Sequence, residues 1–299
     1  MKYVDRSNVI YRMDRADKPL LSVEDNTEIT VRTYDCFKEA ILPESSTTAD
    51  ICFDELNPAT GPIYINGAAS GDTLKVEILN IKLDEVSVTE IDKEFGCLSS
   101  RVEQPRIRRM PVDDKGIRFS EKLYLQKKPM IGVIGVAPMD MPVPTDTPDV
   151  HGGNMDCTEI KEGAVLYLPV FAEGALLSLG DLHACMGDGE IGGCGAEISG
   201  EVTLRLSVLK NERKLYPVVL TEDKLHVIGS GPTVEEAWTA AAAQMHGYLT
   251  EETELTPDEA VMLLSLTGDL SICQTVNPNK TVRMSIPLYC IKAYGWKGK

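Results

Sequence analysis

The sequence predicts a mainly β protein, built from sandwich-like or barrel-like sheets, that ends in a smaller C-terminal α+β unit. Two observations lead to this fold class. Over the first two thirds of the 299 residues, apolar and polar residues alternate in short runs, which is typical of half-buried strands. Beyond about Thr221, two Thr-x-x-Glu capping boxes each precede a run of helix-forming residues. We therefore expect a β-rich body over residues 1–220, with 51–135 as a candidate for a separate small β-barrel unit, and an α+β segment over residues 221–299.

The clearest strands of the body alternate with a period of two residues. In residues 73–78, Leu74, Val76 and Ile78 fall on one face, and the apolar positions then change parity, which predicts a β-bulge near Leu79. Two other segments are almost wholly apolar and fit strands that are buried on both faces. These segments are residues 131–136 and 164–170, and a further alternating strand is expected at residues 201–208.

Two long segments between these strands lack a clear pattern. Residues 137–154 are rich in Pro and Gly, and an irregular loop of that length inside a compact domain is usually functional, so we expect an active-site loop there. Residues 84–115 are charged and poorly patterned, and we interpret them as a solvated surface. That surface carries a small basic cluster of Arg106, Arg108 and Arg109.

The last eighty or so residues combine two helices with two strands. Thr233 and Glu236 form the first capping box, and an Ala-rich run to residue 248 follows it. Thr256 and Glu259 repeat the device, with Pro257 at the first helical position, which proline favours. This second helix is expected to continue through residue 264, and strands are expected around residues 270–276 and 281–288.

Composition excludes several classes of partner. The formal net charge of −16 argues against nucleic acid and anionic membrane surfaces, since both require positive patches, and it favours a small neutral or cationic ligand. The chain has no stretch of 18 apolar residues, and its first residues lack the apolar run of a signal peptide. Its eight cysteines include no C-x-x-C pair. We expect reduced thiols and a cytoplasmic location.

The run from Gly180 to Glu190 concentrates groups that bind metals or transfer protons. Asp181 and His183 are two residues apart, as are Asp188 and Glu190, and residues two apart on a strand point to the same face. A Gly-rich bend between the two pairs would let them converge on one point. The pattern indicates metal-assisted hydrolysis or acid–base chemistry, with a calcium-like structural turn or a polar surface loop as the alternative.

A second constellation, His151-Gly-Gly-Asn154-Met-Asp156, lies about thirty residues upstream. Its glycines let the backbone bend sharply or approach a ligand closely. His151 and Asp156 would then face a site, with Asn154 as a hydrogen-bonding group. A histidine in a Gly-rich loop is more often structural, so this motif gains its weight from the nearby Asp181 and His183.

Together these motifs resemble the acetamidase/formamidase family. The resemblance rests on His151 to Asp156, Gly180 to Ala184 and Gly187 to Ile191. It extends to Asn57 to Ile65, Gly71 to Leu74 and the early motif Tyr34 to Phe37. It implies hydrolysis of a short aliphatic amide, of the acetamide or formamide type, to a carboxylic acid and ammonia. We also expect a homo-oligomer.

This chemistry assigns a role to each candidate residue. Amide cleavage needs a polarised carbonyl, an activated nucleophile and a proton for the departing nitrogen. We expect metal-activated water, with Glu190 as the base and His183 as a second catalytic residue. Zinc suits a mixed nitrogen and oxygen ligand set, whereas manganese or calcium suits sites where oxygens dominate. The candidate metal ligands are Asp35, His151, Asp156, Asp181 and His183, and the candidate substrate-binding residues are Asn154, Asp188 and Gly189.

Two other functions remain open from the sequence. The first is a thiol amidohydrolase, with Cys185 as the nucleophile and His183 or Glu190 as its base, which would act without metal. The second is a β-rich binding module that uses the same acidic loops to hold structural calcium without turnover.

Overall fold

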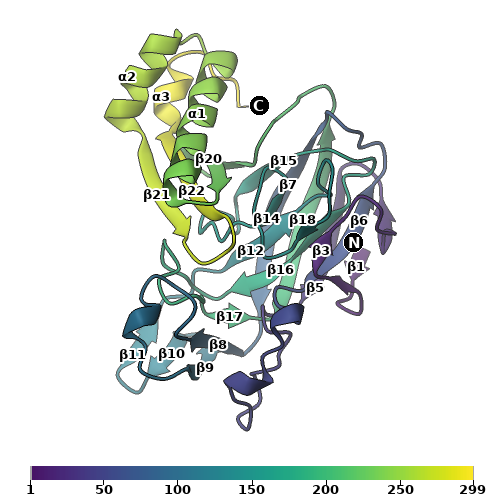
Figure 1. Cartoon of the computed structure of the whole chain (residues 1–299). Helices are drawn as coiled ribbons and strands as arrows, with labels where there is room; N and C mark the ends of the chain where they lie inside the picture. The colour runs from purple at the N-terminus through teal and green to yellow at the C-terminus, as the bar shows by residue number, and fades with distance from the viewer. Residues whose placement is uncertain (1, 299) are drawn as a thin grey trace.

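The structure, a computed structural model, describes residues 2–298, and most of its strands belong to two large sheets (Figure 1). The first is a nine-stranded sheet that contains the long alternating segments. Its strands, in spatial order, are β1 (Lys2–Val4), β5 (Thr27–Thr33), β18 (Gly200–Leu209), β7 (Thr73–Leu83), β15 (Val165–Pro169), β19 (Val218–Leu220), β20 (Lys224–Gly231), β22 (Lys280–Pro287) and β21 (Asp269–Gln274).

The second sheet has eleven strands and carries the motifs singled out above. Its main path runs through β11 (Leu123–Leu125), β10 (Gly116–Ser120), β9 (Arg106–Asp113), β8 (Val86–Ile91), β17 (Glu197–Ile198), β16 (Leu177–His183), β12 (Met130–Gly135) and β14 (Gly152–Asn154). From β16 branches β6 (Ala59–Ile65), which also pairs with β2 (Val9–Ile10) and β4 (Leu21–Val23). A separate ladder joins β3 (Arg12–Met13) to β13 (Val143–Pro144).

Both sheets contribute to one large hydrophobic core. Val76 and Leu204 of the nine-stranded sheet are fully buried in the same cluster as Ile131 and Leu179 of the other sheet. Inward-facing side chains from two sheets form the core of a β-sandwich in this way. The prediction of a mainly β fold is confirmed.

The C-terminal α+β unit is also present, and Figure 1 shows its helices gathered at one end of the molecule. Thr233 caps α1 (Val234–Glu252) and Thr256 caps α2 (Pro257–Thr267), each through the reciprocal bonds of a capping box. α1 packs on β20 and β22, and this interface forms a second core. α1 continues beyond the predicted end at residue 248, and the short α3 (Leu288–Lys292) was not anticipated.

The predicted bulge lies where the alternation changes parity. Along β18, Thr203 pairs with Asn80 of β7, but the next residue, Leu204, pairs with Ile78, so Leu79 is the extra residue. The bulge lets β7 keep apolar side chains on the core side along its whole length, because it shifts the alternation by one residue. β18 itself alternates between buried and half-buried positions throughout.

The interpretation of residues 84–115 as an unpatterned surface was wrong in part. This segment forms β8 and β9, which pair as an antiparallel ladder from Val86 to Ile91. Of the basic cluster, Arg108 stacks over Phe119, while Arg109 is half-buried and donates hydrogen bonds to the backbone oxygens of Leu42 and Ser46. The frequent charges concealed these strands because only one face of each is covered.

The strands of the expected units are shared between the sheets. Within residues 51–135, β7 lies in the nine-stranded sheet, whereas β8 to β12 lie in the other. β19 and β20 continue the nine-stranded sheet into the α+β segment. The division at residue 220 and the separate barrel stay predictions.

The turn at residues 187–190 lies against the α+β unit. Gly189 N donates to Cys273 O at 3.0 Å, and Gly189 forms a β-bridge with Gln274 at the end of β21. Among residues 2–298, no helix combines the length and the hydrophobicity that crossing a bilayer requires.

Candidate active site

Asp181 and His183 lie on β16 with one residue between them, and their side chains meet in the interior. His183 Nε2 lies 3.5 Å from Asp181 Oδ1, 3.7 Å from Asp156 Oδ1 and 3.2 Å from Glu197 Oε2. All four side chains are at most 2% exposed. One imidazole nitrogen is therefore surrounded by three buried carboxylates.

Strand pairing brings these residues together from separate parts of the chain. His183 pairs with Glu197 across β16 and β17, and Asp156 follows β14, which pairs with β12. Gly132 of β12 adjoins two of the carboxylates. A Cβ atom at Gly132 would come within 2.5 Å of Asp181 Oδ2 and 2.6 Å of Asp156 Oδ1. The absence of a side chain at Gly132 lets both carboxylates approach.

Three site residues adopt left-handed backbone conformations. The φ angles are 45° at Asp156, 55° at Asp181 and 46° at Glu190. Such a conformation costs a non-glycine residue on the order of 1 kcal/mol, and residues held in this way cluster at functional sites. The surrounding strands therefore hold these three carboxylates in positions that the local chain does not favour.

The site holds more negative charge than its single imidazole can balance. Burial, together with the neighbouring carboxylates, raises the pKa of both Asp156 and Asp181 to about 7. Burial and Asp156 raise the pKa of Glu190 well above its usual range. Burial alone would lower the pKa of His183, but Glu197 and Asp181 outweigh it and raise that pKa. The cluster therefore requires protons or a cation.

Several oxygen atoms of the cluster lack hydrogen-bond donors. Among residues 2–298, Asp156 Oδ1, Asp181 Oδ1 and Glu197 Oε2 are buried without a hydrogen-bond partner. Leaving such a group unpaired costs about 1–3 kcal/mol, so native proteins rarely do so without a reason. A bound cation or substrate would satisfy these atoms.

Two groups of side chains in the cluster have the composition of metal ligands. Asp156, His183 and Glu190 form one, and Cys36, Asp181 and Glu197 form the other. Within each group the ligand atoms lie within 4.8 Å of one another, and every member is buried. Imidazole and thiolate favour zinc over calcium, which takes oxygen ligands. The donor set, four carboxylates with one imidazole and one thiol, could hold a divalent metal ion.

A cavity of about 320 Å³ opens onto the cluster. Asp181, Glu190 and Glu197 line its polar part. Asn154 and Asn277 also line it, and Asn277 comes from the loop between β21 and β22. The α+β unit therefore contributes to the site.

The two asparagines meet the cluster at one edge. Asn277 Nδ2 donates to Asp156 Oδ2 at 2.9 Å and to the backbone oxygen of Asn154 at 3.0 Å. Asn154 Oδ1 is buried without a donor among residues 2–298. Asn277 therefore orients Asp156, while the side-chain carbonyl of Asn154 is available to a ligand.

Asp35 and His151, both candidate ligands, do not join the cluster directly. The carboxylate of Asp35 accepts hydrogen bonds from the backbone N–H groups of Phe37 and Glu39 at 3.0 and 2.7 Å, and so it holds the turn that presents Cys36. His151 is buried, and burial lowers its pKa to about 4. Neither residue belongs to the two ligand groups.

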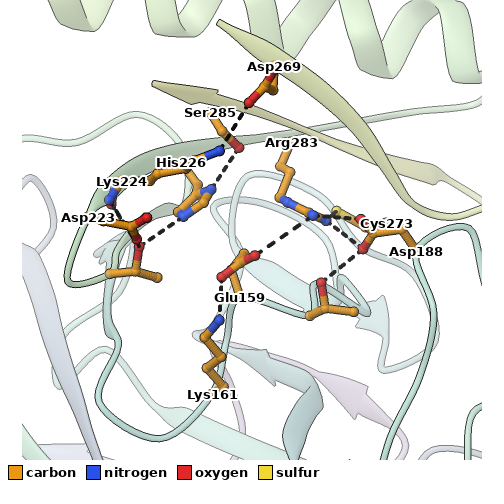
Figure 2. A network of polar contacts seen from close by, with 12 residues as sticks. Glu159, Lys161, Asp188, Asp223, Lys224, His226, Asp269, Cys273, Arg283 and Ser285 are labelled. Carbon is orange, nitrogen blue, oxygen red and sulfur yellow. Dashed lines mark hydrogen bonds and ion pairs between the residues drawn. The ribbon is translucent and has the colours of Figure 1, made fainter. Parts of the chain in front are cut away.

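Asp188 points away from the cavity, into the polar network of Figure 2. Its carboxylate accepts two hydrogen bonds from Arg283, at 2.8 and 2.7 Å, and one from Thr158 at 2.9 Å. Gly189 contacts the α+β unit through its backbone, because Thr275 Oγ1 donates to Gly189 O at 3.1 Å. Asp188 and Gly189, two of the three candidate substrate-binding residues, therefore anchor the turn that carries Glu190.

Cys185 has neither the position nor the ionisation of a nucleophile. Cys185 is not one of the described residues (2–298) that line the cavity, and burial raises the pKa of its thiol. A nucleophilic cysteine needs the opposite shift, because the thiolate is the reactive form.

Sequence reasoning missed Glu197, Cys36 and Asn277. Glu197 was the easiest of the three to predict from the sequence, because it lies within the otherwise apolar run Ala196 to Ile198. A carboxylate flanked by apolar residues on a short strand indicates a buried charge with a function. Asn277 lies in an ordinary turn sequence, and its contribution depends on how the two parts of the chain dock.

Comparisons with known proteins agree along the chain. The sequence model of the Acetamidase/Formamidase family matches residues 8–146 and 140–291. An acetamidase from Mycolicibacterium smegmatis is 43% identical over 75 residues, and a putative formamidase from Schizosaccharomyces pombe is 48% identical over 62 residues. These alignments cover 25% and 20% of this chain but only 18% and 15% of those relatives.

Solved structures match over nearly the whole chain. The crystal structure of an acetamidase from Bacillus halodurans superposes with a TM-score of 0.96 at 41% identity, covering 98% of this chain and 99% of that one. A structure from Thermoanaerobacter tengcongensis, described as a predicted acetamidase/formamidase, gives the same TM-score and identity and covers 99% of each chain. A gamma lactamase from Delftia acidovorans, at 20% identity and a TM-score of 0.67, shares the fold.

Proposed function

Because the chain belongs to the Acetamidase/Formamidase family, we propose that it hydrolyses carboxamides to a carboxylic acid and ammonia at the cluster around His183. The observation that carries this proposal is a set of buried carboxylate oxygens that lack hydrogen-bond partners among residues 2–298, beside a cavity that Asp181 and Glu197 line. A small neutral amide can enter a site of this kind, whereas an anionic substrate would meet a like charge.

We propose that the cluster holds a divalent metal ion, with zinc as the best fit to its donors. His183, Asp156 and Asp181 are the proposed ligands, and Cys36 and Glu197 complete the second group beside Asp181. When bound, such an ion polarises a carbonyl and lowers the pKa of water. Asp35 and His151 stay predicted ligands: Asp35 also accepts hydrogen bonds within the turn at Cys36, and His151 Nε2 is buried without a hydrogen-bond partner among residues 2–298.

Side chains of the protein would transfer the proton from water to the leaving nitrogen. Water attacks the carbonyl carbon, the C–N bond breaks, and the nitrogen leaves as ammonia. Glu190 lines the cavity and belongs to the same group as Asp156 and His183. It is therefore placed to take a proton from water and to return it to the departing nitrogen. The side-chain carbonyl of Asn154 would accept a hydrogen bond from the NH₂ group of the amide.

The alternatives differ in what inactivates the protein. Ammonia release from acetamide and formamide should stop when the protein is treated with a chelator and should return when zinc is added back. Elemental analysis of active, dialysed protein should find stoichiometric metal. Activity that survives chelation but not alkylation would instead favour the thiol mechanism, and metal binding without turnover would favour the calcium module.

The cellular location, the oligomeric state and the classes of partner are predictions from the sequence. We propose a cytoplasmic homo-oligomer that acts on a small amide and has no nucleic-acid or membrane partner. The net charge of −16 supports the last two points.

A further inference from the structure

The active-site cavity is far larger and more apolar than acetamide or formamide needs. Its volume of about 320 Å³ lies at the lower end of the range for sites that enclose drug-sized ligands. Besides the carboxylates of the cluster, six large apolar side chains line the cavity. These are Phe37, Ile51, Phe53, Leu56, Phe95 and Val276.

Aromatic side chains are concentrated in this apolar lining. The chain has only five phenylalanines, and three of them, Phe37, Phe53 and Phe95, line the cavity. The rings of Phe53 and Phe95 stack with their centroids 5.8 Å apart and their planes at 25°. Phe53 begins the 3₁₀ turn Phe53–Glu55, and Phe95 lies in the loop after β8, so separate segments build the pair.

This aromatic pair is exposed to solvent at the cavity. Phe53 is 57% exposed and Phe95 is 37% exposed, whereas Phe37 is buried. Covering apolar surface stabilises a complex, and aromatic rings gain further when they pack against one another. An acyl group as small as acetyl, held at the carboxylates, has no apolar surface left to cover these rings.

We infer that the protein prefers amides whose acyl group carries an aromatic ring, such as phenylacetamide, over acetamide. The inference rests on the proposed amide hydrolysis. With the amide group at the cluster, the ring of the acyl group would contact the apolar lining that includes the stacked pair. The lining also carries the acidic groups Glu90 and Asp146 and the basic group Lys280.

The test compares kcat/KM for phenylacetamide and acetamide by ammonia release. One well-placed apolar contact changes selectivity about tenfold or more, so we expect a ratio of at least about 10 in favour of phenylacetamide. Phe53→Ala and Phe95→Ala should each lower this ratio by about threefold to tenfold, because they remove one ring of the pair. Phe119→Ala is the matched control. Phe119 is 38% exposed and stacks with Arg108 outside the cavity, so the ratio should not change.

The outcomes separate the inference from the function on which it rests. Turnover of acetamide that equals or exceeds that of phenylacetamide would overturn the inference and leave amide hydrolysis intact. The inference also fails if Phe53→Ala dissociates an oligomer in sedimentation and leaves the ratio unchanged, since the rings would then belong to an interface between copies. Absence of ammonia from either amide, with zinc present, would overturn the proposed function and the inference together.

Discussion

Two clusters of buried or half-buried charge lie on either side of the turn at residues 187–190, and they are neutralised differently. In the network of Figure 2, Arg283 bonds both oxygens of Asp188 and lies 3.9 Å from Glu159, which also pairs with Lys161 at 2.8 Å. In the cluster around His183, one imidazole faces three carboxylates, with Glu190 close by.

The direction of the pKa shifts shows the same contrast. Burial tends to raise the pKa of Asp188, but hydrogen bonds and charge from Arg283 outweigh it, so the pKa is lowered. Burial raises the pKa of Asp181 to about 7, and no cation other than His183 opposes it in the described cluster. Removing one partner of a buried charge pair destabilises the fold, whereas a buried charge that the chain does not balance indicates a site for a ligand or a cation.

Replacing the histidine of each region should give the largest difference between the two clusters. His183→Ala should abolish bound metal and lower kcat by about 10³-fold or more, because the only imidazole of the cluster is lost. His226→Gln is the matched control. His226 is buried and bonds Ser285 Oγ at 2.8 Å and Thr221 Oγ1 at 3.2 Å, so its loss should affect stability but not metal content. Equal loss of metal in both variants would contradict the distinction.

A pair of glutamates extends the comparison to proton transfer. Glu190→Gln keeps the size and hydrogen bonding of the side chain but cannot carry a proton, so kcat should fall by about 10²-fold or more. Folding and metal content should change little. Glu159→Gln alters a carboxylate of the Arg283 network and should leave kcat near that of the parent. If Glu190→Gln lowers metal occupancy together with kcat, Glu190 is a ligand and not the base.

Arg283 should matter for stability, and its effect on activity should be indirect. Arg283→Met removes the cation that Asp188 shares with Glu159, and we expect the free energy of unfolding to fall by about 2 kcal/mol. The loss is no larger because Asp188 is partly exposed, so water screens its charge. Lys161→Met, at a more exposed cation, should change it by less than about 1 kcal/mol. Denaturant titration measures both. A kcat reduced as strongly as in Glu190→Gln, at unchanged stability, would place Arg283 in the chemistry.

The sequence predicted the parts of this comparison that depend on local pattern. Alternation located β7, β18 and the bulge at Leu79, because burial of one face imposes a period of two. The same rule predicted that Asp181 and His183 share a face, since both lie on β16. It failed for Asp188 and Glu190, because Gly189, with φ of 95°, and Glu190, with φ of 46°, turn the chain so that the two side chains face opposite ways.

The rest of the site depends on pairings that a single sequence does not reveal. Glu197 reaches His183 through the pairing of β17 with β16, and the two-residue strand β17 is too short to show alternation. Asn277 reaches Asp156 only because the loop after β21 docks on the body. Long-range register and docking are set by the whole core and not by local spacing.

The smallest expected effect tests whether the His183 cluster is unfavourable for folding when no metal is bound. In metal-free protein, Asp181→Asn removes one of several buried, mutually repelling carboxylates, and we expect it to raise the free energy of unfolding by about 1 kcal/mol, or Tm by about 2 °C. The pKa of Asp181 is raised in the folded state, so its protonated carboxyl contributes its full stability below about pH 4, and this contribution is lost as the pH rises from about 4 through about 7. The gain in the free energy of unfolding from Asp181→Asn should therefore be largest above pH 7 and vanish near pH 4.

Asp188→Asn should instead lower the free energy of unfolding above about pH 4, because the lowered pKa of Asp188 means that its ionised form stabilises the fold there. Thermal melts of both variants across this range would contradict the comparison if Asp181→Asn destabilised the metal-free protein at every pH.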